Sequence, residues 1–285
     1  MSNGHSNAAK GGKSSNAPTG QKAAFHMPER IHLIMHTDSI KSSDVNTFAD
    51  AAKVLKADYE SAAAYKLHEV RVVKVRSGKD IVDTINATTI KAKSILSLDI
   101  VSHGNQGGVH IARKLASPIE ASFLQKRWHV ALRANSDHPQ TATDAEFMEE
   151  SMHGLYDGWA GKRIVAYYYN QAETDDSNDI RYISDLQFDN FADDAFVEFH
   201  GCRTGEIIPE VNWFFDNFAK NFSDKLPENC RVVGHTVNAF PNKNPSGKSS
   251  DYRHGKVRVY KGGGKLLIDA QERFGLKFQN SSTPP

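Results

Sequence analysis

The feature that most constrains the fold is a regular alternation of short apolar runs with amphipathic stretches. Residues 31–35 (IHLIM), 70–75 (VRVVKV) and 95–101 (ILSLDIV) have the length and composition of buried strands. Between them, residues 44–55 and 78–90 place apolar side chains mostly at three- and four-residue spacing, as amphipathic helices do. This strand–helix–strand–helix–strand order predicts an α/β fold in which a mostly parallel central sheet is flanked by helices.

The same alternation returns in the second half of the chain. Residues 195–199 (AFVEF) and 230–234 predict further strands, separated by a helical pattern over 207–222. A hairpin is predicted near the C-terminus, from residues 256–260 to residues 265–268 across three consecutive glycines. The middle of the chain has weaker patterns, which predict two helices, a strand, an acidic loop and a strand or helix start: 118–132, 143–159, 163–169, 173–179 and 182–186.

Charge and cysteine content exclude several classes of protein. The 285 residues include 35 Lys and Arg against 34 Asp and Glu, for a net charge of +1. A dedicated nucleic-acid or polybasic membrane binder needs a clear basic excess, so neither partner is expected. No stretch approaches about 18 consecutive apolar residues, which predicts no membrane span. The two cysteines, Cys202 and Cys230, are too few for a disulfide scaffold or a four-thiolate metal site.

We expect one large domain between two tails. Residues 1–28 are rich in small and polar residues and predict a disordered N-terminal tail, and residues 276–285 predict a second tail. Residues 29–275 would form the folded domain, with an insertion at about 109–190. The N-terminal segment has no apolar stretch of the kind found in secretory signal peptides. A cytoplasmic protein is therefore expected, although delivery by a specialised secretion system would leave no mark of this kind.

Reactive side chains follow two of the predicted strands. His103-Gly104 comes directly after the strand over 95–101, and Gly201-Cys202 comes directly after the strand over 195–199. Functional groups collect beyond the carboxyl ends of strands in an open parallel sheet. If the two strands are neighbours, His103 and Cys202 face each other as a base and a nucleophile. A nearby imidazole raises the reactive, thiolate fraction of a cysteine.

Backbone N–H groups at the same place complete a possible catalytic site. Gly104 lets the chain approach a substrate oxygen closely, and its N–H and that of Cys202 would form an oxyanion hole. Each such donor often contributes about 2.7–4 kcal/mol to the stabilisation of a transition state. The pattern therefore favours attack on a carbonyl carbon by Cys202, with His103 as the proton-transferring group.

At these residues the chain resembles the caspase-like superfamily of cysteine peptidases (clan CD), which includes caspases, metacaspases and legumain. Members share an apolar strand that ends in His-Gly and a later apolar strand that ends in the catalytic Cys, in the same order as His103-Gly104 and Cys202 here. The resemblance covers roughly residues 30–274 and implies an α/β sandwich and cysteine endopeptidase activity on a protein or peptide substrate. It implies that His103 is the base, that Cys202 is the nucleophile and that Gly104 lies beside the oxyanion.

The chain departs from true caspases in two respects. Their signature is Q-A-C-[RQG]-G with the His about 50 residues upstream. Here the nucleophile lies in His200-Gly201-Cys202-Arg203-Thr204-Gly205, and the separation from His103 is 202 − 103 = 99 residues. The insertion predicted at about 109–190 accounts for the extra length, and these departures leave the cleavage specificity open.

Three other interpretations stay open at this level. A caspase-like fold can serve as a binding module with an idle His–Cys pair. Cys202 can instead be a buried structural thiol, because free Cys packs like a small hydrophobe. His-Gly-Cys-Arg also resembles the Ser-His-Gly-Cys motif of L,D-transpeptidases. That family implies a β-sandwich and a further His shortly upstream, whereas residues 181–199 contain no His.

Other residues near the predicted strand ends are candidates for substrate contact. His200 shares a strand face with Cys202 and could tune the thiol or line the substrate groove, as could His235 and Thr236 after the next strand. Four charged residues near the predicted loops could line a specificity pocket: Asp99, Arg203, Asp251 and Arg253. The sequence does not indicate which of them does so.

The remaining thiol and the imidazoles give no sign of a cofactor. Cys230 has no glycine frame and is interpreted as a structural thiol. A zinc site made of His200, Cys202 and His235 lacks a regular ligand spacing, so neither a metal nor a cofactor is expected. No pattern indicates an oligomeric state.

Overall fold

In the computed structural model, the described residues are Met1, 30–37, 47–62, 68–88, 93–111, 154–158, 180–207, 216–239, 255–274 and 277–278. Several sequence predictions lie outside them: nearly all of both tails, the helix over 118–132, the strand over 163–169 and the acidic loop over 173–179. The boundaries of the predicted domain and of its insertion therefore stay predictions. Among the described residues, no helix has the length and apolar character needed to cross a membrane.

The centre of the molecule is an eight-stranded sheet in a mixed α/β arrangement. Its strand order is β12-β11-β10-β9-β8-β3-β1-β2. Five neighbouring strands are parallel: β2 (Glu69–Lys74), β1 (Ile31–His36), β3 (Ile95–Val101), β8 (Phe191–Phe199) and β9 (Arg231–His235). Three antiparallel strands continue one edge: β10 (Gly255–Lys261), β11 (Lys265–Phe274) and β12 (Lys277–Phe278). The predicted central sheet with mostly parallel strands is confirmed, and so is the predicted hairpin, which is formed by β10 and β11.

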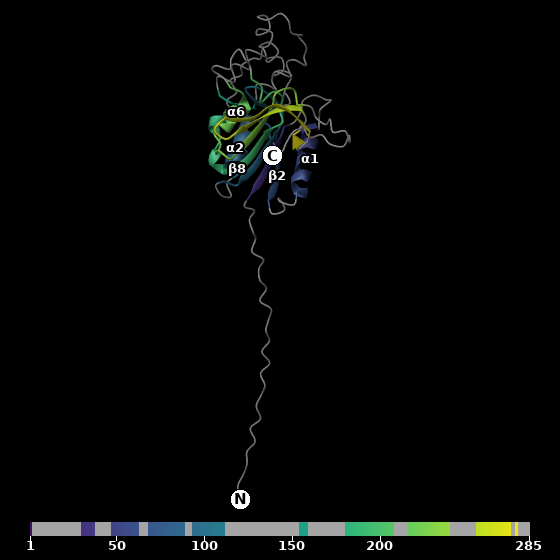
Figure 1. Cartoon of the computed structure of the whole chain (residues 1–285). Coiled ribbons are helices and arrows are strands. Elements are labelled where there is room, and N and C mark those ends of the chain that lie inside the picture. The colour runs from purple at the N-terminus through teal and green to yellow at the C-terminus, as the bar shows by residue number, and fades with distance from the viewer. Residues whose placement is uncertain are drawn as a thin grey trace, which may run out of the picture.

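Helices cover both faces of this sheet (Figure 1). Helix α1 (Thr47–Ser61) packs on β1 and β2, whereas α6 (Phe218–Ser223) packs on β9 and β10 from the opposite side. Helix α2 (Gly78–Ala87) follows β2 and begins at Ser77, whose hydroxyl accepts a hydrogen bond from the Asp80 amide at 3.0 Å. This cap satisfies one of the amides that the first turn leaves open.

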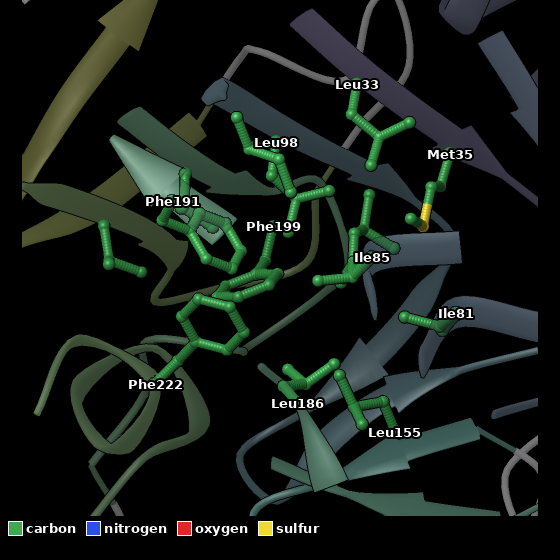
Figure 2. Close-up of a cluster of buried hydrophobic side chains, with 14 of the residues drawn as sticks. Leu33, Met35, Ile81, Ile85, Leu98, Leu155, Leu186, Phe191, Phe199 and Phe222 are labelled. Atoms are coloured by element: carbon green, nitrogen blue, oxygen red, sulfur yellow. The ribbon is translucent and has the colours of Figure 1, made fainter. Parts of the chain in front are cut away.

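The two faces of the sheet have different side chains because successive residues of a strand point in opposite directions. On the side of α2 and α6, the strands contribute an aliphatic and aromatic core: Leu33, Met35, Leu98, Ile100, Val197 and Phe199. Figure 2 shows four of these side chains, Leu33, Met35, Leu98 and Phe199, in one cluster with Ile81 and Ile85 of α2 and Phe222 of α6. We call this side the apolar face.

On the side of α1, apolar residues alternate with titratable ones along the same strands. Ile34 and Val101 pack against Phe48 and Leu55 of α1. Beside them lie six buried polar side chains: His32, Ser97, Asp99, Glu198, His200 and His235. We call this side the polar face. Both faces exclude water, so the difference between them lies in chemistry and not in burial.

A second, four-stranded sheet extends beyond the carboxyl end of β3. Its order is β4 (His103–Asn105), β5 (Gly108–His110), β6 (Gly154–Tyr156) and β7 (Ile180–Tyr182). The predicted helix over 143–159 is wrong where the structure describes it, because β6 pairs with β5 and Gly154 takes a φ of +147°. Pairing with a neighbouring strand overrides the local helical spacing there. The ambiguous segment 182–186 contains the end of β7 and a short 3₁₀ helix, Ile183–Asp185.

Two predicted elements have different bounds in the structure. The strand predicted over 195–199 begins four residues earlier, at Phe191, after a 3₁₀ turn over Phe188–Asn190. The helix predicted over 207–222 is described only as α6, because residues 208–215 lie outside the described residues. The other strand and helix predictions around the parallel sheet agree with β1, β2, β3, β9 and α2 to within a few residues, whereas α1 ends at Ser61, six residues beyond the predicted end.

Candidate active site

His103 and Cys202 lie beyond the carboxyl ends of two neighbouring strands. Strands β3 and β8 pair in parallel, and the last pair in register is Ile100 with Phe199. This offset of 199 − 100 = 99 residues equals the separation between His103 and Cys202. The amide of His200 extends the pairing by donating to the carbonyl of Ile100 at 2.9 Å. Each candidate residue therefore lies three positions after the last paired residue of its strand.

The two strand-end loops meet backbone to backbone at their glycines. A Cβ added to Gly201 would lie 3.0 Å from both the Cα of Gly104 and the carbonyl oxygen of His103. A Cβ on Gly104 would lie 3.1 Å from the Cα of Gly201 and 3.2 Å from the carbonyl oxygen of Cys202. These distances are shorter than an ordinary van der Waals contact, so a Cβ at either position would require the facing loop to shift. The glycines that frame His103 and Cys202 thus allow the two loops to touch.

The loop that carries Cys202 is fixed to β9 and to the segment that follows it. Arg203 has a φ of +57°, an uncommon conformation for a residue with a Cβ. Its amide donates to the carbonyl of Val237 at 3.1 Å, and the amide of Gly205 donates to the carbonyl of His235 at 2.8 Å. These bonds set the position of the loop independently of its side chains.

Helix α6 ties the two strand-end segments together. The amide of Phe218 donates to the carbonyl of Gln106, in the turn between β4 and β5, at 2.7 Å. The amide of the next residue, Ala219, donates to the carbonyl of Thr204 in the cysteine loop at 3.0 Å. Gln106 also hydrogen-bonds Glu206 through its side chain. The first two residues of α6 therefore hydrogen-bond both the turn after His103-Gly104 and the loop that carries Cys202.

The side chains of His103 and Cys202 border the same apolar cluster beside α1. The His103 ring stands edge-on to the ring of Phe48, with centroids 5.0 Å apart. Cys202 packs partly buried against the cluster that contains Phe48, Val101 and Ala239, and its Sγ lies 3.9 Å from the carbonyl oxygen of Ala239. Both residues are of intermediate exposure, and within His103 the Nε2 atom is itself buried.

Cys230 occupies a different environment. Its side chain is fully buried at the start of β9, and its Sγ lies 3.3 Å from the carbonyl oxygen of Ala192. Burial raises the pKa of the Cys230 thiol to about 11, so it stays protonated at neutral pH. A protonated thiol is a poor nucleophile. Of the two cysteines, Cys202 is the one whose surroundings permit reaction.

His110 is the register partner of His103 in the small sheet. It is only 4% exposed, and its ring lies 5.8 Å from that of Tyr156. Burial, with a smaller contribution from the charge of His103, lowers the pKa of His110 to about 3. His110 is therefore neutral at physiological pH and adds no competing positive charge beside His103.

A hydrogen-bonded chain runs across the polar face below the strand ends. Tyr59 of α1 donates to Oδ2 of Asp99 at 2.8 Å, and Oδ1 of Asp99 accepts from Nε2 of His200 at 2.7 Å. Burial, followed by the charge of Asp99, raises the pKa of Tyr59 well above its usual value, so its hydroxyl remains a donor. The Tyr59 ring also stacks on His32, with centroids 4.3 Å apart.

The predicted substrate-contact residues lie in this buried region. His200 and His235 are both 0% exposed, and Thr236 is 8% exposed, with its hydroxyl 3.3 Å from the carbonyl oxygen of Lys256. Their burial favours a role inside the protein over contact with substrate, and the substrate role stays a prediction. Glu198, which was not among the predicted residues, lies in the same region, with its Oε1 3.7 Å from Nδ1 of His200.

The sequence interpretation did not identify the role of Asp99 or include Glu198 and Tyr59. Asp99, a specificity-pocket candidate in the sequence, is 1% exposed and is bound to His200. The signal was available: each acid interrupts a buried apolar strand, ILSLDIV or AFVEF, where a charge is costly unless it has a partner. Of the other pocket candidates, Arg203 lies in the cysteine loop, whereas Asp251 and Arg253 lie outside the described residues.

No protein-family model matches the chain, and no curated protein matches its sequence.

Proposed function

We propose that this chain is a cysteine endopeptidase of the caspase-like superfamily, with Cys202 as nucleophile and His103 as general acid–base. The observation that carries the proposal is the contact between the two strand-end loops at Gly104 and Gly201. It places a histidine and a half-exposed cysteine on adjacent loops, in the chain order of that superfamily. The mostly parallel sheet with helices on both faces is compatible with its α/β sandwich.

In the proposed reaction, Sγ of Cys202 attacks the scissile carbonyl carbon and the amide nitrogen leaves with a proton from His103. A thioester then joins the acyl part of the substrate to Cys202. Water, deprotonated by His103, attacks this thioester, which releases the carboxylic acid and restores the thiol. The amides of Gly104 and Cys202 would donate to the oxyanion in both steps.

The surroundings of the two side chains suit these roles. The edge of the Phe48 ring meets His103 and restricts its rotation, while the hydrogen bonds of Arg203 and Gly205 fix the backbone next to Cys202. Such fixed positions reduce the entropy lost when the reacting groups align. The same fold does not fit the L,D-transpeptidase interpretation, which implies a β-sandwich.

The test is hydrolysis of a mixed peptide library by the purified full chain. Cys202→Ala and His103→Ala should each reduce cleavage by about 10³-fold or more, while the circular dichroism spectrum and melting temperature stay close to those of the parent. Cys230→Ala is the matched control, because it removes the other thiol at a buried site. Undiminished proteolysis in the Cys202→Ala chain would end the proposal.

Labelling with a peptidyl electrophile separates the enzyme from an idle binding module of the same fold. We expect modification at Cys202, slowed strongly by His103→Ala, and little modification at Cys230, whose pKa is about 11. Equal labelling of both cysteines would favour the binding module. So would a rate of Cys202 labelling that is the same in the parent and in His103→Ala.

A further inference from the structure

Three titratable side chains converge inside the polar face at the carboxyl ends of β8 and β9. Glu198, His200 and His235 each offer a ligand atom, and these atoms all lie within 4.8 Å of one another. All three side chains are at most 1% exposed. A carboxylate and two imidazoles are the ligand set of several zinc sites in proteins. We propose that Glu198, His200 and His235 bind a divalent transition-metal ion of the zinc class.

The orientation of His200 is the strongest argument for this site. Its Nε2 lies 2.7 Å from Oδ1 of Asp99, so this nitrogen carries the proton and donates it. Asp99 is itself held by the hydroxyl of Tyr59 at 2.8 Å. In the neutral imidazole, Nδ1 then presents its lone pair toward Glu198. A carboxylate that accepts from the far nitrogen of a metal-binding histidine is the usual second layer of such sites.

The distance between His200 and Glu198 fits a shared ion better than a hydrogen bond. Nδ1 of His200 lies 3.7 Å from Oε1 of Glu198, beyond the range of an N–H···O hydrogen bond. This nitrogen is buried and makes no hydrogen bond among the described residues. Two ligands at about 2.0–2.2 Å from one tetrahedral ion lie roughly 3.3–3.6 Å apart. A small adjustment would therefore place both atoms on one ion.

Charge favours the same conclusion. Asp99 and Glu198 are both 1% exposed, and an oxygen of each lies within 3.7 Å of a nitrogen of the His200 imidazole. Two buried carboxylates around one imidazole leave a negative excess in a region of low dielectric, where a divalent cation is the largest compensating charge available. The third ligand, His235, comes from the adjacent strand β9, which pairs in parallel with β8.

The ion would have a structural effect next to the candidate active site. Glu198 is the penultimate residue of β8 and His200 follows that strand directly before Gly201-Cys202, while His235 ends β9 directly before Thr236. Bound metal would cross-link these two strand ends and stabilise the folded chain by its binding free energy. This proposal does not depend on the peptidase activity, and its tests measure binding.

The experiment is a titration of the metal-free full chain with Co²⁺, whose visible absorption reports its coordination. The chain carries Cys202→Ser, so that the exposed thiol does not bind the probe. We expect one Co²⁺ per chain, displaced by Zn²⁺ and not by Mg²⁺, and a higher melting temperature with metal. Glu198→Gln and His235→Ala should each weaken binding by at least tenfold, and Asp99→Asn by about 10–100-fold.

His68→Ala is the matched control, because His68 and His32 form a separate imidazole pair, Nδ1 to Nε2, at 3.1 Å. Binding that is lost in His68→Ala and retained in Glu198→Gln would overturn the proposal, as would a failure to bind Co²⁺ and Zn²⁺ at micromolar concentrations. Glu198→Gln and Asp99→Asn preserve side-chain volume. They decide the question if His235→Ala does not fold.

Discussion

One face of the central sheet packs aliphatic and aromatic side chains against α2 and α6, whereas the other holds titratable side chains beside α1. The same strands build both, so each residue's position in the two-residue repeat decides which environment it enters. The apolar face gains stability through non-directional burial. The polar face instead depends on directional hydrogen bonds. The carboxylate of Asp99 accepts one from Tyr59 and one from His200, which fixes the orientation of all three side chains. The comparison indicates that packing on the apolar face stabilises the fold, whereas hydrogen bonds on the polar face orient its titratable side chains.

The largest expected effect comes from the apolar face. Phe199 is fully buried, and its ring lies 4.8 Å from that of Phe218 and 5.1 Å from that of Phe222 (Figure 2). Phe199→Ala should lower the free energy of unfolding by about 3–5 kcal/mol through lost burial and a residual cavity. Urea denaturation measures the change. Leu267→Ala, at a residue 45% exposed, is the control and should shift stability by less than about 0.5 kcal/mol.

On the polar face, a change that keeps volume constant should still be costly. Asp99→Asn replaces the acceptor shared by Tyr59 and His200 and should lower the free energy of unfolding by about 1.5–3 kcal/mol. Tyr59→Phe removes one hydroxyl, while the stacking on His32 remains, and should cost about 0.5–1.5 kcal/mol. If Asp99→Asn left the free energy of unfolding of the metal-free protein unchanged, the hydrogen bonds of the polar face would not contribute to its stability, and this contrast with the apolar face would be lost.

In the two loops that follow β3 and β8, the contact between backbone atoms should determine how a substitution affects stability. Gly201→Ala places a methyl group 3.0 Å from the Cα of Gly104 and should cost about 1–3 kcal/mol, with a parallel loss of peptide hydrolysis. Gly158→Ala is the control, since a Cβ there meets nothing within 4 Å. Equal stability and activity in the two variants would show that the strand-end loops do not need their close approach.

The smallest effect near neutral pH should come from His32 on the polar face. Burial, then the charge of His68, lowers its pKa from 6.5 to about 4. The unfolded chain therefore takes up the proton first, so stability is full above about pH 6.5 and is lost as the pH falls toward 4. Urea midpoints measured from pH 7.5 to 4.5 should show this loss, with a weaker slope in His32→Asn. The titratable groups in the described core of the apolar face, Cys230 and Tyr260, have pKa values that burial raises, so both stay neutral in this range and should add no such slope.

Much of the central sheet was predictable, because its strands and helices have distinct periods in the sequence. The neighbouring positions of β3 and β8 were not. They depend on which strands pair across 89 intervening residues, from 102 to 190 (191 − 101 − 1 = 89), and no local pattern encodes that choice. The helix predicted over 143–159 was wrong at β6 for a related reason, since Leu155 is placed by pairing with Val109. The local spacing of apolar residues predicts whether a segment is a helix or a strand. Pairing with a distant strand accounts for the segment where that prediction was wrong.

The candidate site divides in the same way. The glycine-framed His103 and Cys202 stood out in the sequence because both follow apolar strands. The roles of Asp99 and Glu198 did not, although each interrupts such a strand, because those roles depend on the His200 imidazole, which only the folded structure brings beside both carboxylates. His200 and His235 were identified as candidates, yet their burial in the polar face follows only from the three-dimensional arrangement.

The pairing of β3 with β8 has a consequence for the covalent continuity of the chain. His103 and Cys202 are brought together by the hydrogen-bonded pairing of the strands before them and by the contact between their loops. A single break between residues 111 and 154 would assign the two side chains to separate polypeptides. The sheet would still join those polypeptides, so a nicked molecule would keep both halves of the site in one particle.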